Sequence, residues 1–304
     1  MDTERRDCVI IGGGPAGLTA AIYLARFHLS VSVFDDGTSR AASIPVSHNH
    51  AGFPGGVSGA ELLARMRAQA LIYGADILEA KVTALSGVTG DFIVSSEKGA
   101  VSARTVLMAT GVLNRSPSMP REKHDEALSR GLIRYCPVCD GFEVTDKRIG
   151  VIGQGSKAFK EALFLRSYSK DITILSSSSE HELKPGERAQ LQELGISVIC
   201  GPHEIDLEQD EILIRTGGAT YAFDSVYPAL GSDIRSELAS GVGAMLSEEG
   251  CVFVDSHQRT DVEGLYAAGD VVIGLDQISH AMGQAGVAAT TIRNDLSSIA
   301  CLVR

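Results

Sequence analysis

The feature that most constrains the fold is a pattern that occurs twice: an apolar strand, a glycine-rich turn, a helix and a second strand. The first copy runs from "DCVIIGGGPAGLTAAIYLARFH" to the strand "SVSVFDD". The second copy is "RIGVIGQGSKAFKEALFLRSYSKDITIL". Alternating strands and helices predict parallel sheets covered by helices, and the repeat indicates an internal duplication. We therefore predict an α/β fold with two Rossmann-like, three-layer domains.

The first glycine turn has the spacing that a dinucleotide requires. The residues singled out in this turn are Gly12, Gly14, Pro15, Ala16 and Gly17. In G-x-G-x-x-G the first glycine allows the tight turn, the second lets the backbone approach a pyrophosphate, and the third lets helix and strand pack closely. Asp35 ends the next strand, where a carboxylate can accept hydrogen bonds from an adenosine ribose. The first copy is therefore predicted to bind a dinucleotide.

The second glycine turn keeps the fold signal but has a weaker ligand signal. Gly153 and Gly155 are followed by Ala158 in the third position, where alanine is tolerated. The next strand runs into "SSSSEH", which contains no arginine or lysine for a 2′-phosphate. A second Rossmann domain is predicted, with NAD(P)H as its candidate ligand. An empty or altered site is the alternative, and the serines could bind a ribose or form a solvated loop.

Composition and charge exclude several classes of function. The 304 residues carry a net charge of −11, which disfavours nucleic acid or an anionic membrane as a partner. No apolar run approaches the roughly 20 residues that span a bilayer. The start, "MDTERRDCVIIGGG", lacks the long apolar region of a secretory signal. We therefore expect a cytoplasmic protein.

The stretch "YCPVCDG" contains the one close pair of cysteines, Cys136 and Cys139, followed by Asp140. A structural zinc site needs a second pair of ligands, and the other cysteines are isolated, so no metal site is predicted. Two inert thiols are a second alternative. A redox pair explains more, because C-x-x-C at a turn or helix start can close a disulfide, and the adjacent acid can exchange a proton with the departing thiol. Asp140 could also act as a helix N-cap.

Four motifs now stand in order: G-G-G-P-A-G, C-x-x-C-D-G, G-x-G-x-x-A and A-A-G-D before a final helix. In this order the chain resembles the low-molecular-weight thioredoxin reductases over essentially its whole length. The resemblance implies a discontinuous FAD-binding domain, residues 1–117 and 245–304. It implies an inserted NAD(P)-binding-like domain, residues 118–244, that carries the dithiol.

The resemblance also implies a role for each site residue. Cys139 corresponds to the thiol that meets the flavin, Cys136 to the thiol that exchanges with substrate, and Asp140 to the acid–base residue. The residues expected to hold FAD are Gly12, Gly14, Pro15, Ala16, Gly17, Asp35, Gly111, Gly269, Asp270, Gln277, Ile278 and Ala281. Those expected at a nicotinamide nucleotide are Gly153, Gly155 and Ala158.

The resemblance leaves several alternatives open for the reaction. The "GGQL" segment of the family is replaced by "SRAASIPVSHNHAGFPGG", and the arginines after the second nucleotide strand are absent. The expected activity is reduction of a disulfide in a thioredoxin-like protein or a small molecule. The alternatives are an oxygen-dependent dithiol oxidase of the gliotoxin or holomycin type, a ferredoxin-linked thioredoxin reductase, and a flavin-binding redox sensor. Family members are commonly homodimers, so a homodimer is expected.

Overall fold

The computed structural model describes residues 5–302; the outermost ends of the expected FAD-binding domain, residues 1–4 and 303–304, lie outside the described residues. The chain divides into two compact units, which are described separately. The first contains residues up to 43, 58–113 and those from 234 onward, and the second contains residues 44–57 and 114–233. Within residues 5–302, no helix has the length and apolar character that crossing a membrane requires.

The first unit is built on one mixed sheet of seven strands, ordered β3-β2-β1-β6-β5-β4, with β16 also paired to β6. The strands are β1 (Arg6–Ile11), β2 (Val31–Asp35), β3 (Asp76–Glu79), β4 (Val82–Val88), β5 (Asp91–Ser96), β6 (Gly99–Met108) and β16 (Leu265–Ala267). β1, β2, β3, β6 and β16 run parallel, whereas β4 and β5 extend the sheet as an antiparallel meander. The stretch "DFIVSSEKGAVSARTVLM" forms the antiparallel hairpin of β5 and β6.

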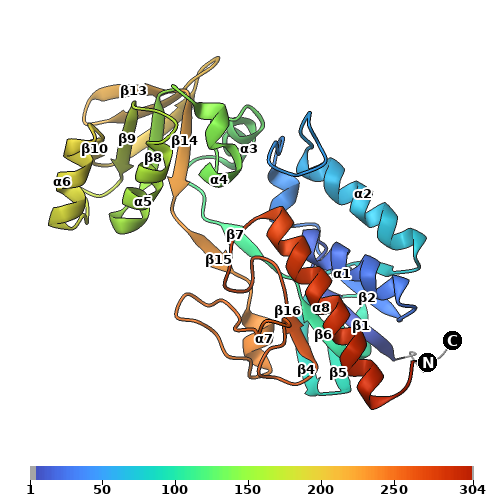
Figure 1. The fold of residues 1–304 in the computed structure, drawn as a ribbon. Coiled ribbons are helices and arrows are strands. Elements are labelled where there is room, and N and C mark those ends of the chain that lie inside the picture. The colour runs from blue at the N-terminus through green and yellow to red at the C-terminus, as the bar shows by residue number, and fades with distance from the viewer. Residues whose placement is uncertain (1–4, 303–304) are drawn as a thin grey trace. The chain divides into compact units, whose positions relative to one another are not determined.

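Helices cover one face of this sheet and anchor its glycine turn. α1 (Pro15–Arg26) and α8 (Ile278–Ile299) pack together over β1 and β2, and α2 (Gly59–Ile72) lies beside α1 (Figure 1). Alanines line the α1–α8 contact, which lets the two helices approach closely. A second cluster fills the other face, where the short α7 (Glu237–Gly241) packs against β4. The sheet is therefore buried on both sides, as continuous apolar strands require.

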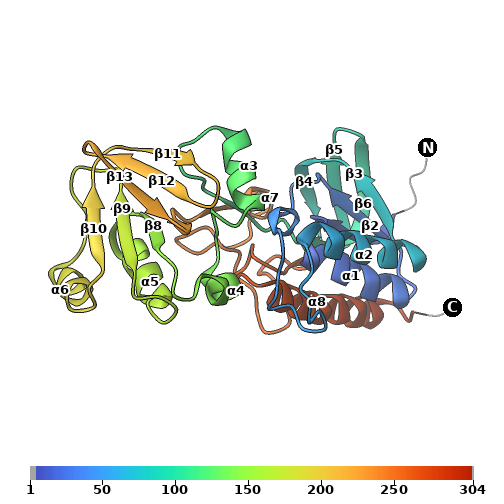
Figure 2. The same cartoon turned by 90° about the horizontal axis from the view of Figure 1, so that it is seen from above.

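The second unit repeats the architecture with a smaller sheet. Four parallel strands lie in the order β10-β9-β8-β14: β8 (Ile149–Gly153), β9 (Ile172–Ser176), β10 (Ser197–Cys200) and β14 (Ser225–Ala229). α5 (Gly155–Leu165) and α6 (Pro185–Glu193) cover one face (Figure 2). The other face packs against α3 (Arg121–Ser129) and the antiparallel strands β11 (His203–Leu207), β12 (Ile212–Thr216) and β13 (Ala219–Phe223). The predicted pair of Rossmann-like sheets is thus confirmed.

The chain passes between the units within two short strands, β7 (Val112–Asn114) and β15 (Ser232–Ile234), which pair with each other. The expected boundaries, after residue 117 and before residue 245, both lie later in the chain than these strands. The second expected boundary lies further from the observed one, because residues 234–244, which include α7, pack against the first sheet. Residues 44–57 group with the second unit, which the sequence did not predict. The assignment of one nucleotide to each unit stays a prediction.

Candidate active site

The two paired cysteines form a disulfide at the start of a short helix in the second unit. Cys136 is the N-cap of α4 (Pro137–Asp140), Pro137 occupies its first position, and the Cα atoms of Cys136 and Cys139 are 5.2 Å apart. The backbone N–H groups of Cys139 and Asp140 both donate to the Cys136 carbonyl, at 2.8 and 3.1 Å. Both cysteines are half-buried, so the residues of the disulfide are only partly shielded from solvent. The prediction of a bridged pair at a helix start is confirmed.

Asp140 does not cap a helix with its side chain; it accepts hydrogen bonds from two residues that sequence reasoning missed. Tyr227 Oη donates to Oδ1 at 2.8 Å, and Arg134 Nη1 donates to Oδ2 at 3.2 Å. Tyr227 lies on β14, which pairs with β8 at the end of the four-stranded sheet, and is fully buried. Burial raises the pKa of Asp140 above its ordinary value, and the two hydrogen-bond donors oppose that effect only in part. The carboxyl group of Asp140, the residue directly after Cys139, is therefore held by two donors and retains a proton more readily than an exposed aspartate.

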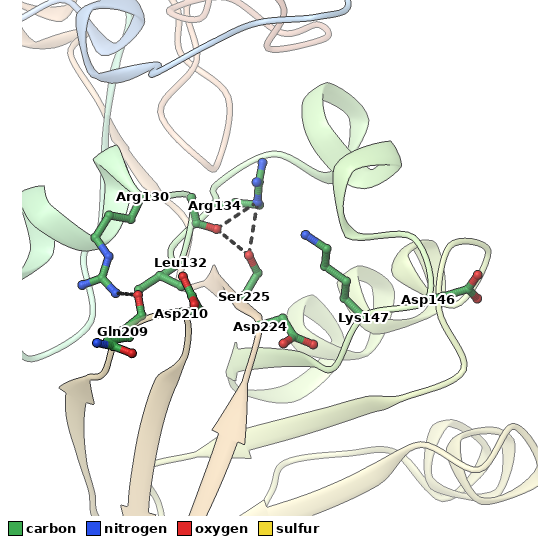
Figure 3. Close-up of a pocket in the computed structure, with 10 residues that line it drawn as sticks. Arg130, Leu132, Arg134, Asp146, Lys147, Gln209, Asp210, Asp224 and Ser225 are labelled. Carbon is green, nitrogen blue, oxygen red and sulfur yellow. Dashed lines mark hydrogen bonds between the residues drawn. The ribbon is translucent and has the colours of Figure 1, made fainter.

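Arg134 also reaches the wall of a cavity of about 540 Å³ on the same unit (Figure 3). Its Nε donates to Ser225 Oγ at 3.2 Å and to the Gly131 carbonyl at 3.1 Å. Lys147 and Asp224 line the same cavity. Arg134 therefore joins the cavity wall to the carboxyl beside the disulfide, and its guanidinium is fixed from both sides.

A second acid, Glu161 on α5, lies close enough to Asp140 for their charges to interact. Burial, and then the charge of Asp140, raise the pKa of Glu161 to about 7. The folded protein consequently binds a proton at Glu161 between about pH 4.5 and 7 that the unfolded chain has released. Because the folded state then binds more protons, its stability falls as pH rises through this window. The sequence offered no signal for this, since one glutamate in a helix is usually a solvated residue.

We expect Glu161→Gln to remove this pH dependence. A pKa raised from 4.5 to about 7 corresponds to roughly 3 kcal/mol of unfolding free energy between pH 5 and pH 8. Urea unfolding of the second unit should show wild type and variant similarly stable at pH 5 and the variant more stable at pH 8. Glu193→Gln, at an exposed position on α6, is the control and should leave the pH dependence unchanged. Parallel pH curves for wild type and Glu161→Gln would contradict the assignment.

The first glycine loop is shaped for close backbone approach. Gly12 has φ +117°, and a Cβ there would lie 2.1 Å from the Ala109 carbonyl oxygen; a Cβ at Gly17 would lie 1.9 Å from the Gly12 carbonyl oxygen. Gly14 is the N-cap of α1, and in the described structure no side chain caps this end. Asp35 ends β2, and its carboxylate accepts the Gly37 N–H at 3.0 Å. These groups fit the ADP half of a dinucleotide, with free helix amides for the phosphates.

The remaining residues predicted for FAD gather around the same loop. A Cβ on Gly269 would lie 3.0 Å from the Cβ of Ala16 and 3.6 Å from that of Ala281, so the A-G-D segment, α1 and α8 meet here. Gln277 is the N-cap of α8, and Ile278 is its first residue. Pro15 opens α1, and Gly111, at φ +65°, accepts the Arg235 N–H just before β7. The structure therefore brings together the first-unit residues that the sequence singled out.

Asp270 has a partner that the sequence did not reveal. Arg40, in the 3₁₀ turn η1 (Arg40–Ser43), contacts Asp270 at 3.1 Å and Asp276 at 2.9 Å. Burial, and then the charge of Asp276, raise the pKa of Asp270 above its ordinary value. Arg40 lies in the stretch that replaces the "GGQL" segment of the resembled family. That replacement was the only signal from which its role could have been suspected.

The second glycine loop occupies the corresponding place in the second unit. Gly153 ends β8, Gly155 opens α5 at φ +58°, and Ala158 is buried one turn later. These residues have the predicted local structure. Residues of the segment that follows β9, from Ser176 onward, contact this loop. Among residues 5–302 no group of three histidine, cysteine or acidic side chains is placed to hold a metal ion.

Tyr227→Phe should raise the pKa of Asp140 further, because the tyrosine hydrogen bond stabilises the charged carboxylate. Loss of a hydrogen bond to the charged form favours the protonated carboxyl. The acid–base step in which Asp140 is predicted to act should therefore shift to higher pH. Anaerobic stopped-flow rates measured from pH 5 to 9 test this. Tyr221→Phe, on neighbouring β13, is the matched control; identical profiles for Tyr227→Phe and wild type would refute the role of this bond.

Comparison with known proteins supports the same site. Residues 6–285 match the family model described as pyridine nucleotide-disulphide oxidoreductase. A thioredoxin reductase from Mycolicibacterium smegmatis is 35% identical, with 88% of each chain covered. A bifunctional thioredoxin reductase/thioredoxin from Mycobacterium leprae is 31% identical over 88% of this chain and 60% of its own.

A solved thioredoxin reductase from Streptococcus pyogenes superimposes with a TM-score of 0.89, at 27% identity, over 98% of this chain and all of its own. The residues matched by the family model, 6–285, include both glycine loops and the disulfide that lies between them in the sequence. The chain therefore belongs to the pyridine nucleotide-disulphide oxidoreductase family, as a thioredoxin reductase-like, FAD-dependent disulfide oxidoreductase.

Proposed function

We propose that the chain exchanges an electron pair with the disulfide of a thioredoxin-like protein through Cys136 and Cys139, and that the pair is carried by FAD. The observation that supports this most directly is the Cys136–Cys139 disulfide, with the Asp140 carboxyl fixed beside it by Tyr227 and Arg134. The relative in which a thioredoxin reductase is fused to a thioredoxin supports a protein partner. A small-molecule disulfide is the alternative substrate.

The protein's own groups account for the exchange step. In the reduced pair, the Cys136 thiolate attacks one substrate sulfur, forms a mixed disulfide and releases the other substrate sulfur as a thiolate. Cys139 then attacks Cys136, which restores the Cys136–Cys139 bond and releases the second substrate sulfur. Each leaving thiolate needs a proton, and Asp140 is placed to deliver it because its raised pKa favours the protonated form.

The first glycine loop is proposed to hold the cofactor. Gly12, Gly14 and Gly17 would let the pyrophosphate approach the α1 amides, and Asp35 would accept the ribose hydroxyls. When bound, FAD supplies a two-electron carrier for the dithiol. Asp270 and the first turn of α8 would face the flavin side of the same molecule, where helix amides favour negative charge.

A nicotinamide nucleotide is proposed as the electron donor, supported by the description of the matching family. Gly153, Gly155 and Ala158 would receive it in the second unit. The lack of an arginine or lysine in "SSSSEH" gives no support for a choice of NADPH over NADH. A cytoplasmic location and a homodimer stay predictions.

The experiment that tests the proposal is anaerobic mixing of FAD-loaded protein with dithiothreitol, followed at the visible absorption band of the flavin. A dithiol that reaches the flavin through the cysteine pair should bleach the band, and oxidised thioredoxin should restore it. Bleaching without recovery by thioredoxin, but with recovery by a small disulfide, would favour the alternative substrate. No bleaching by dithiothreitol would contradict the proposed relay itself.

A further inference from the structure

The second glycine loop is contacted by the chain's own residues 176–187, here called the closing segment. Ser176, at the end of β9, donates through its hydroxyl to Gln154 Oε1 at 2.6 Å, and Gln154 Nε2 donates to the Glu180 carbonyl at 3.1 Å. A Cβ on Gly155 would lie 3.4 Å from the Glu182 carbonyl oxygen. The backbone of the closing segment therefore lies against the loop that would receive a pyrophosphate.

A carboxylate of the closing segment reaches the first turn of α5. Ser156, the second residue of that helix, donates to Glu187 Oε1 at 2.6 Å, while the Lys184 backbone N–H donates to Oε2 at 2.9 Å. The Ser156 bond is the main cause that lowers the pKa of Glu187, so the group is anionic at neutral pH. Anions are favoured at a helix N-terminus, and a phosphate would bind at the same place.

His181 is a buried polar residue against the second glycine loop. It is only 5% exposed, its interaction with the Gly153 backbone is strong enough to affect its pKa, and within the described residues no hydrogen bond of regular geometry reaches either ring nitrogen. Burial is the main cause that lowers the pKa of His181, so the ring is uncharged at neutral pH. A buried donor or acceptor without a partner is costly, and a ligand group that reached it would remove that cost.

The first glycine loop also has a carboxylate against it, but in a different place. A Cβ on Gly13 would lie 2.3 Å from Asp35 Oδ2, whereas around Gly14, at the helix start, the nearest atom to an added Cβ is the Ser39 hydroxyl oxygen, at 3.2 Å. No carboxylate is hydrogen-bonded to the first turn of α1 in the part of the chain that the structure describes. The two copies of the motif therefore differ in one specific way: a carboxylate is bound at the helix start of the second copy and not of the first.

Building on the proposed function, we propose that Glu187 holds the place of a nucleotide phosphate at the second glycine loop and sets the affinity for the nicotinamide nucleotide. A dinucleotide must displace the Glu187 carboxylate from Ser156 before its pyrophosphate can contact the α5 amides. The residue is thus a determinant of nucleotide affinity rather than a catalytic residue, since it touches neither the disulfide nor Asp140. Removing its charge should tighten binding and leave dithiol exchange unchanged.

The test is calorimetric titration of FAD-loaded protein with NADPH and with NADH. Glu187→Gln is the main variant, because the glutamine oxygen can still accept the Lys184 N–H while its amide nitrogen can donate to the Ser156 hydroxyl, which keeps the helix start folded. Glu193→Gln, on the exposed far end of α6, is the matched control. We expect Glu187→Gln to tighten the Kd for the nucleotides at least about tenfold, by removing repulsion between two anions. The limiting rate of flavin bleaching should stay unchanged while the half-saturating nucleotide concentration falls.

Three results would overturn the inference. These are an unchanged or weaker Kd in Glu187→Gln, an equal gain in Glu193→Gln, or micromolar binding by wild type that the variant does not improve. Unfolding midpoints of both variants show whether the fold is retained, and Glu187→Asp, which keeps the charge, should restore weak binding. Dithiothreitol bleaching is measured in the same samples. Its absence would contradict the proposed function, whereas its presence with an unchanged Kd would contradict only the role of Glu187.

Discussion

Cys139→Ser is expected to abolish electron transfer between a dithiol and the flavin, with the rate falling at least about 10³-fold, as when a catalytic nucleophile is removed. The physical reason is that a single remaining thiol can form a mixed disulfide but cannot resolve it, so no electron pair leaves the substrate. Stopped-flow bleaching by dithiothreitol under anaerobic conditions measures the effect. Cys136→Ser should be equally inactive in turnover, because the thiol proposed to attack the substrate is missing.

The control for this prediction is Cys200→Ser, at the end of β10 in the same unit, where the thiol is unpaired. That variant should bleach at the wild-type rate. Cys139→Ser and Cys136→Ser should each retain one additional titratable thiol relative to the oxidised wild type. If the variant with both cysteines of the pair replaced by serine kept full disulfide activity, the dithiol would not be part of the reaction.

Gly12→Ala is expected to destabilise the first unit by about 3 kcal/mol or more and to yield protein without bound FAD. The new Cβ would lie 2.1 Å from the Ala109 carbonyl oxygen, and the backbone φ of +117° is strained for any residue with a side chain. Ala109 directly follows β6, and Gly12 directly follows β1, which pairs with β6. Relief of the clash must therefore separate the ends of these two central strands, from which the glycine loop begins. Flavin absorbance of purified protein and urea unfolding measure the two effects.

Gly74→Ala separates backbone strain from the clash. Gly74 follows α2 with φ +89°, and nothing lies within 4 Å of a Cβ placed there. Only the left-handed backbone conformation is penalised in that variant, at about 1–2 kcal/mol, and FAD should remain bound. An equal loss of FAD in the two variants would mean that general destabilisation, and not the closeness of the loop to Ala109, explains the result for Gly12.

Local sequence signals were sufficient for the strands, glycine turns and helices of the two repeated units and for the final helix. Apolar runs such as "DCVII" and "IGVI" predict buried strands, and glycines at fixed spacing predict turns that only glycine can make; both signals act within about ten residues of chain. The final helix, expected after the A-A-G-D motif, is observed as Ile278–Ile299. The unit boundaries were less accurate, because a boundary depends on which sheet a segment packs against. Residues 234–244 carry no local mark of the first sheet, yet they fill its far face.

The same division applies to the site. The sequence by itself determined the residues whose chemistry depends on neighbours in the chain: the glycine loops, and Cys136, Cys139 and Asp140 in one turn. Only the tertiary structure decided what surrounds them. Tyr227 is far from Asp140 in sequence. It meets Asp140 because β14, the last strand of the second sheet along the chain, pairs with β8, the first strand of that sheet.

Glu187 likewise meets Ser156 only because α6 begins next to α5. A carboxyl pKa depends on burial and on charges within a few ångströms, and those distances are set by packing. The sequence therefore identified the reacting groups, and the fold decided how readily Asp140 holds its proton and which carboxylate stands at the second glycine loop.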